Sequence, residues 1–146
     1  MGRYTIIAFA LAALLGFGFW WSGSNDTSTP AAANVSDSPG PAMVDVTVPK
    51  TLSANAEIGK VAFEAKCAVC HGANAAGQDG VAPPLVHKIY EPSHHGDAAF
   101  LLAAKNGVRA HHWRFGNMPP VEGVTDSDVK MIIAYVRELQ RANGIN

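Results

Sequence analysis

Both cysteines of this chain and one histidine fall within a five-residue run, Cys67-Ala68-Val69-Cys70-His71. Two thiols three positions apart, followed directly by an imidazole, form the Cys-x-x-Cys-His pattern of a covalent c-type haem attachment site. Each thiol can bond one vinyl group of the haem, and His71 can then approach the iron from the proximal side. We therefore expect one covalent haem c on Cys67 and Cys70, with His71 as its first axial iron ligand.

Other chemistry for this run is less consistent with the rest of the chain. A tetrahedral zinc site needs further strong ligands, usually a second Cys or His pair at defined spacing, and the chain has no third cysteine. A thioredoxin-type dithiol would lie near a βαβ pattern, which the Ala-rich surroundings lack. A structural disulfide between Cys67 and Cys70 would leave His71 without a role.

A second axial ligand must come from outside this run. Met118 precedes Pro119 and Pro120, whose fixed backbone favours an extended loop from which a thioether can point at the iron. Met131 falls in a predicted helix, where methionine is more often core filler, and Met43 falls in a polar segment. The remaining candidates are histidines: His87, His94, His95, His111 and His112.

Three helical patterns and no alternating strand pattern indicate a small all-α domain. The first helix begins after the N-cap Ser53, runs into the haem motif, and carries Ile58 and Val61 at helical spacing. The second covers residues 97–106 and is short and apolar enough to be buried. The third is capped by Thr125, with Asp128 placed as a capping-box acid, and ends at Asn143-Gly144.

From residue 51 to residue 146 the chain resembles the class I monohaem cytochromes c, of the membrane-anchored bacterial type. The haem motif, a proline loop and the Met118-Pro119 loop follow one another in the order found in that family. The resemblance implies a cytochrome c fold of three to five helices around one covalent haem, with His71 and Met118 as the two iron ligands. It also implies a terminal helix crossing in which Gly59 and Phe63 face Ile132 and Tyr135.

The resemblance assigns roles to residues around the haem. The family's Gly-Pro-x-Leu loop corresponds to Ala82-Pro83-Pro84-Leu85, so the Pro83 carbonyl is expected to accept a hydrogen bond from Nδ1 of His71. Ala82 replaces the usual glycine, which leaves the local turn in question. The haem propionates of the family need hydrogen-bond donors, for which the candidates are Arg109, Trp113 and Arg114, with Tyr90 as a further one.

The amino-terminal part differs in composition from the haem domain. Tyr4 to Trp21 is an uncharged apolar run of 18 residues, preceded by Arg3, which favours a retained transmembrane anchor over residues 1–22 with the rest of the chain outside. Cleavage as a secretory signal, giving a soluble periplasmic protein, is the alternative. Residues 23–50 are rich in Ser, Pro and Ala, which indicates a flexible linker.

The expected function is one-electron transfer in a respiratory or photosynthetic chain, between partners such as a quinol-cytochrome c reductase and a terminal oxidase or reductase. The 11 Lys and Arg balance 12 Asp and Glu, which argues against nucleic-acid binding. An electron-transfer subunit of a larger dehydrogenase or oxidase is the alternative, and an enzyme such as a peroxidase would need an open distal position. The pairs His94-His95 and His111-His112 have no Cys, Asp or Glu at ligand spacing beside them, so solvated loop histidines are favoured over a second metal site.

Overall fold

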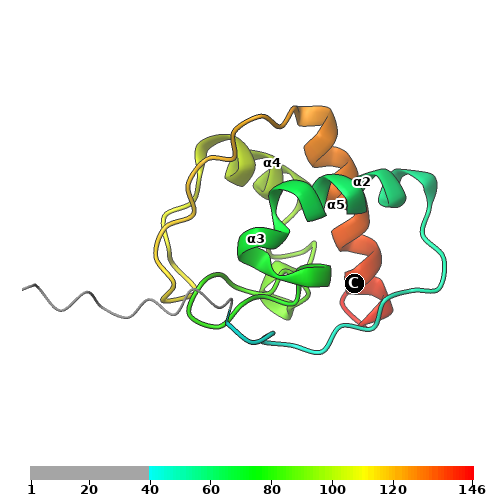
Figure 1. Cartoon of the computed structure of the whole chain (residues 1–146), viewed down its shortest axis with the longest axis horizontal. Helices are drawn as coiled ribbons and strands as arrows, with labels where there is room; N and C mark the ends of the chain where they lie inside the picture. The colour runs from blue at the N-terminus through cyan, green and yellow to red at the C-terminus, as the bar shows by residue number, and fades with distance from the viewer. Residues whose placement is uncertain (1–39) are drawn as a thin grey trace, which may run out of the picture. The chain divides into compact units, whose positions relative to one another are not determined.

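The computed structural model describes residues 40–146, and the predicted anchor and most of the predicted linker lie outside this part. Four α-helices form the described fold (Figure 1): α2 Ala54–Lys66, α3 Ala68–His71, α4 Asp97–Asn106 and α5 Asp126–Ala142. The short 3-10 turns η1 (Ala73–Ala75) and η2 (Lys88–Tyr90) lie between α3 and α4. Only two isolated β-bridges occur within residues 40–146, so the prediction of an all-α domain is confirmed. Within the same residues, no helix combines the length and the hydropathy that crossing a bilayer requires.

The core forms where α2 crosses α5, which Figure 1 shows as the green and the orange-red helix. A Cβ atom on Gly59 would lie 1.8 Å from the main-chain oxygen of Met131, so only glycine lets the two backbones come this close. One turn further, the fully buried rings of Phe63 and Tyr135 pack with their centroids 5.7 Å apart. The predicted contact between Gly59, Phe63 and the last helix is therefore present.

The buried face of α2 differs from the one that the apolar periodicity favoured. Ser53 caps the helix as predicted, its side chain accepting a hydrogen bond from the Ala56 amide at 3.3 Å. Ile58 and Val61, however, are 59% and 69% exposed, and the helix buries Ala56, Gly59 and Phe63 instead. Small residues on α2 let α5 approach closely at the crossing. The face of α2 that carries them is therefore buried, and the face with the branched side chains is not.

Helix α5 is the most buried element and begins at a capping box. The Thr125 side chain accepts from the Asp128 amide, and the Asp128 carboxylate accepts from the Thr125 amide at 2.8 Å. Its predicted end also holds, since Asn143 is the C-cap residue. Helix α4 forms over the predicted residues, but it is half exposed along its length rather than buried.

The segment from residue 40 to residue 50, which the sequence places in the flexible linker, runs along the helical domain. The amides of Met43 and Val44 both donate to the Ala76 carbonyl, and Thr47 exchanges two hydrogen bonds with the Asn143 side chain. Backbone pairing of this kind needs no apolar composition, so the polar sequence gave no sign of it. Residues 40–146 all lie in one compact unit.

Candidate functional site

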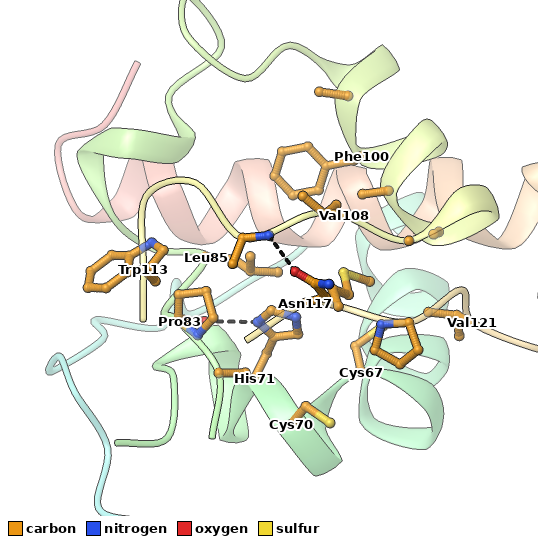
Figure 2. A pocket seen from close by; sticks show the side chains of 18 of the residues that line it. Cys67, Cys70, His71, Pro83, Leu85, Phe100, Val108, Trp113, Asn117 and Val121 are labelled. Atoms are coloured by element: carbon orange, nitrogen blue, oxygen red, sulfur yellow. Dashed lines mark hydrogen bonds between the residues drawn. The ribbon is translucent and has the colours of Figure 1, made fainter. Parts of the chain in front are cut away.

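A cavity of about 570 Å³ opens between α3, α4, α5 and the loops that join them. This volume lies within the roughly 300–1,000 Å³ of small-molecule and cofactor pockets. Figure 2 shows side chains from α3, α4 and the loops at the cavity, among them His71, Leu85, Phe100 and Val108. Helix α5 contributes Val129 and Ile132 to the wall. Its walls are mainly apolar, so the site suits a large, flat, largely hydrophobic group.

Both cysteines line the cavity as free thiols. Cys67 is half-buried, and burial raises the pKa of its thiol to about 11, while Cys70 is exposed. Two thiols at the wall of one cavity are placed to bond the two vinyl groups of a haem held there. Among residues 40–146, the two thiols and His71 are not gathered into a set of three metal ligands, which argues against the zinc alternative.

His71 ends α3 and is oriented by the proline loop. Its Nδ1 lies 2.8 Å from the main-chain oxygen of Pro83, which can only accept, so Nδ1 carries the proton (Figure 2). Nε2 is then the nitrogen with a free lone pair, as an iron ligand requires. Burial lowers the pKa of His71, which keeps the imidazole neutral.

The alanine that replaces the family's glycine is accommodated without strain. Ala82 exchanges two main-chain hydrogen bonds with Gln78, at 2.9 and 3.1 Å, and its φ is not positive. The position in this turn that requires glycine is Gly77, because a Cβ atom there would lie 2.5 Å from the Pro84 nitrogen. The Pro83 carbonyl therefore keeps its expected place.

Met118 is the only methionine from residues 40–146 that lines the cavity; Met43 and Met131 do not. The main chains of Met118 and Val108 exchange hydrogen bonds of 2.9 and 3.0 Å. Between them, the Asn117 side chain accepts from the Ala110 amide at 2.9 Å, which closes the loop (Figure 2). Met118 is thus held on a braced loop, as the pair of prolines after it suggested.

The predicted propionate donors are placed differently from one another. Trp113 lines the cavity, and its buried Nε1 has no hydrogen-bond partner among the described residues. Such an orphaned donor costs free energy unless a bound group satisfies it. Arg109 and Arg114 are exposed and do not contribute to the cavity wall, whereas Tyr90 does.

Three residues with structural roles at the site were missed from the sequence. The buried Gln78 donates through Nε2 to the carbonyls of Ala68 and Val69, at 3.1 and 2.9 Å, and so holds α3 in place. Arg137 and Gln140 on α5 are buried beneath the loop that carries Tyr90 and His95. Polar residues of this kind give no periodic signal, so the sequence did not predict that they would be buried.

The cytochrome c family model matches residues 56–140, which is more than half of the chain. The chain belongs to the cytochrome c family. None of the curated proteins searched matches it significantly. Membership gives a domain that binds haem c covalently and carries electrons between redox proteins, and that is not an enzyme. Four features of the site fit a covalently bound haem c. They are the two thiols, the tautomer of His71, the apolar cavity and the unpartnered N–H of Trp113.

Proposed function

We propose that this chain is a one-electron carrier of a respiratory or photosynthetic chain, with Cys67 and Cys70 as thioether anchors and His71 and Met118 as axial ligands. The observation that carries this assignment is the oriented tautomer of His71 in a cavity that Met118 also lines. Haem c supplies a one-electron couple when bound. Two protein ligands leave no position for a substrate, which suits electron transfer rather than catalysis.

The protein's own groups set the conditions for transfer. The Pro83 carbonyl fixes the ring of His71 and increases its basicity, which tunes the stability of the oxidised form. Apolar side chains such as Leu85, Phe100 and Val108 exclude water from the cavity. The N–H of Trp113 is suited to donate to a propionate, and Cys70 marks the exposed side from which electrons can leave.

We propose further that residues 1–22 anchor the chain in the inner membrane, with the haem domain in the periplasm. The uncharged run after Arg3 supports this topology. A shared membrane raises the effective concentration of a tethered carrier near its partners, which compensates for a nearly neutral charge. Partners of the stated kind are a quinol-cytochrome c reductase and a terminal oxidase or reductase.

The axial assignment is tested by comparing Met118→Leu with the matched control Met131→Leu in the full-length holoprotein. Oxidised protein with a thioether-to-iron bond shows a weak far-red absorption band, which Met118→Leu should abolish and Met131→Leu should keep. Met118→Leu should also let the reduced protein bind carbon monoxide. A wild-type spectrum without the band, with both variants unchanged, would point to a histidine ligand instead.

The topology is tested by haem staining of separated membrane and periplasmic fractions. The anchored form predicts a full-length, haem-stained band that leaves the membrane with detergent but not with high salt. A shorter haem-stained band in the periplasm would show signal cleavage. Copurification in detergent with one enzyme at fixed stoichiometry would favour the alternative of a dedicated subunit over a shuttle.

A further inference from the structure

The two histidine pairs of the sequence, 17 residues apart, come together at the rim of the cavity. One ring nitrogen from each of His94, His95 and His112 lies within 4.8 Å of the others. Nε2 of His94 and Nε2 of His112 are 3.3 Å apart. The ring of His111 packs beside this set, 4.2 Å from the ring of His112 between centroids.

The separation of these ring nitrogens matches the separation of ligand atoms around a metal ion. Tetrahedral Zn²⁺ with bonds of 2.0–2.1 Å separates two ligand nitrogens by about 3.3–3.4 Å, and His94 and His112 already have this separation. A hydrogen bond between two exposed imidazoles would add little stability. A ring nitrogen of His95 lies within 4.8 Å of the other two ligand nitrogens, so His95 is near enough to supply the third ligand.

The tautomer of His95 is also that of a metal ligand. Nδ1 of His95 lies 2.6 Å from the Ile89 carbonyl and therefore carries the proton, which leaves Nε2 free to bind a cation. Metal-bound histidines commonly donate their second ring nitrogen to such an acceptor.

The backbone on both sides of the set is fixed in advance. The His94 and His95 amides both donate to the Glu91 carbonyl, and the buried Arg137 donates to the His95 carbonyl at 2.6 Å. On the other side, His112 lies in the loop that the Val108 and Met118 bridge closes. A braced set of donors binds a cation without the cost of ordering two loops.

We propose that His94, His95 and His112 form a second metal site, for a divalent transition metal such as Zn²⁺ or Cu²⁺. Neutral imidazoles suit these cations and discriminate against Mg²⁺ and Ca²⁺, which prefer oxygen ligands. The three ligands leave a fourth position for water. Spacing along the chain disfavours a metal at either histidine pair alone, but the fold supplies the third ligand from a separate loop.

The position of this site gives it a structural consequence. His94 and His95 lie on the loop that Arg137 holds to α5. His112 lies on the loop that carries Met118. A bound metal therefore joins these two loops across the rim of the cavity. Occupancy should make the Met118 loop harder to open, which links metal supply to the stability of the haem site.

The test is Zn²⁺ titration of the untagged full-length holoprotein by calorimetry, because a polyhistidine tag would itself bind the metal. We expect one Zn²⁺ per chain, no binding of Mg²⁺, and a thermal midpoint that rises with Zn²⁺ concentration. His94→Ala and His112→Ala should each weaken Zn²⁺ binding by at least about tenfold. His87→Asn, which changes a histidine outside the set and keeps its capping acceptor, should bind as the wild type does.

Several results would overturn the proposal. Wild-type holoprotein that binds no Zn²⁺, or binds it equally well after His94→Ala and His112→Ala, would show that the set is not a metal site. Equal weakening in His87→Asn would point to nonspecific binding. Zn²⁺ binding that leaves the thermal midpoint unchanged would remove the proposed link between the loops. The haem spectrum of each variant, recorded before titration, shows that the fold and the iron ligands are intact.

Discussion

Nδ1 of His71 donates to the main-chain oxygen of Pro83 across 2.8 Å, and this single contact joins the haem motif to the proline loop. The loop itself is held by the backbone pairing of Ala82 with Gln78 and by the close approach of Gly77 to Pro84. The hydrogen bond shifts electron density toward Nε2, which makes His71 a better donor to an oxidised iron.

Replacing Pro83 by Ala should therefore raise the reduction potential. The variant keeps a carbonyl at this position but releases the fixed φ that directs it, so the hydrogen bond to His71 lengthens and the ligand becomes less basic. The shift should approach about 59 mV, which corresponds to a tenfold change in a one-electron equilibrium. Spectroelectrochemical titration measures it. Pro92→Ala, at an exposed position outside the cavity wall, serves as control, and a potential equal to wild type in both variants would contradict the expectation.

Gly59→Ala should destabilise the fold strongly, although alanine is the better helix former by about 1 kcal/mol. The added Cβ atom would lie 1.8 Å from the Met131 oxygen and 2.9 Å from the Ile132 nitrogen, so α2 and α5 must separate. We expect a loss of about 3 kcal/mol, at the upper end of overpacking. Guanidinium unfolding of the holoprotein gives the value.

Gly96→Ala is the matched control for this change. A Cβ atom at Gly96 would lie 3.5 Å from the Pro92 oxygen, an ordinary contact, and the backbone there has a negative φ of −64°. We expect a change of about 1 kcal/mol or less, mainly from the poorer N-cap that alanine provides. If both variants lost equal stability, the close approach of the two helices would not explain the need for Gly59.

The sequence alone predicted the elements whose signals are local. Ser53 and the Thr125 and Asp128 pair act through neighbouring amides, and the haem motif is contiguous, so each was visible in the order of residues. The family resemblance added the contact of Gly59 and Phe63 with the last helix. The placement of Ala82, by contrast, depended on Gly77, five residues away, which meets the steric demand of that turn.

What the sequence could not predict depends on long-range contacts between polar groups. The sequence around Arg137 does not predict that its side chain hydrogen-bonds to the carbonyls of Tyr90 and His95, more than 40 residues earlier. In the same way, the histidine pairs become a cluster only when two separate loops close on one rim. Apolar periodicity also misled for Ile58 and Val61, because the close approach of α5 at Gly59 decides which face of α2 is covered.

Arg137 should be the most sensitive charged position of the domain. Its side chain is 8% exposed and donates to Asp97, to the Tyr90 and His95 carbonyls and to Gln140. Arg137→Met removes the donor to the His95 carbonyl and to the Gln140 side-chain oxygen, whereas the Tyr90 carbonyl keeps Nε2 of Gln140 as a donor. We expect a loss of about 3 kcal/mol of stability in denaturant unfolding.

Asp97→Asn tests the contribution of the ion pair with Arg137 separately from the other hydrogen bonds that Arg137 makes. The Asp97 side chain is 64% exposed, so removing its charge should cost about 1 kcal/mol or less. A loss from Asp97→Asn as large as that from Arg137→Met would mean that the ion pair, and not the bonds to the two carbonyls, holds the loop. Arg141→Ala, at an exposed position one turn away, should change stability by about 0.5 kcal/mol or less.

The capping box of α5 should make the stability of the holoprotein depend on pH in the acid range. The amide and the hydroxyl of Thr125 both donate to the Asp128 carboxylate, at 2.8 and 2.7 Å, and hold its pKa below the ordinary value of 3.8. A carboxyl whose pKa is lower in the folded state contributes its stabilisation above the unfolded pKa and loses it as the pH falls through the folded pKa. The wild type should therefore lose this contribution below about pH 4.

Asp128→Asn should be less stable than the wild type at neutral pH, and the difference between the two proteins should shrink as the pH is lowered from 5 toward about 2. Thermal unfolding across this range measures the difference. Asp126→Asn is the control, because no hydrogen bond among the described residues ends on the Asp126 side chain, and it should run parallel to the wild type. A constant gap between wild type and Asp128→Asn at every pH would mean that the carboxylate acts through the shape of the cap and not through its charge.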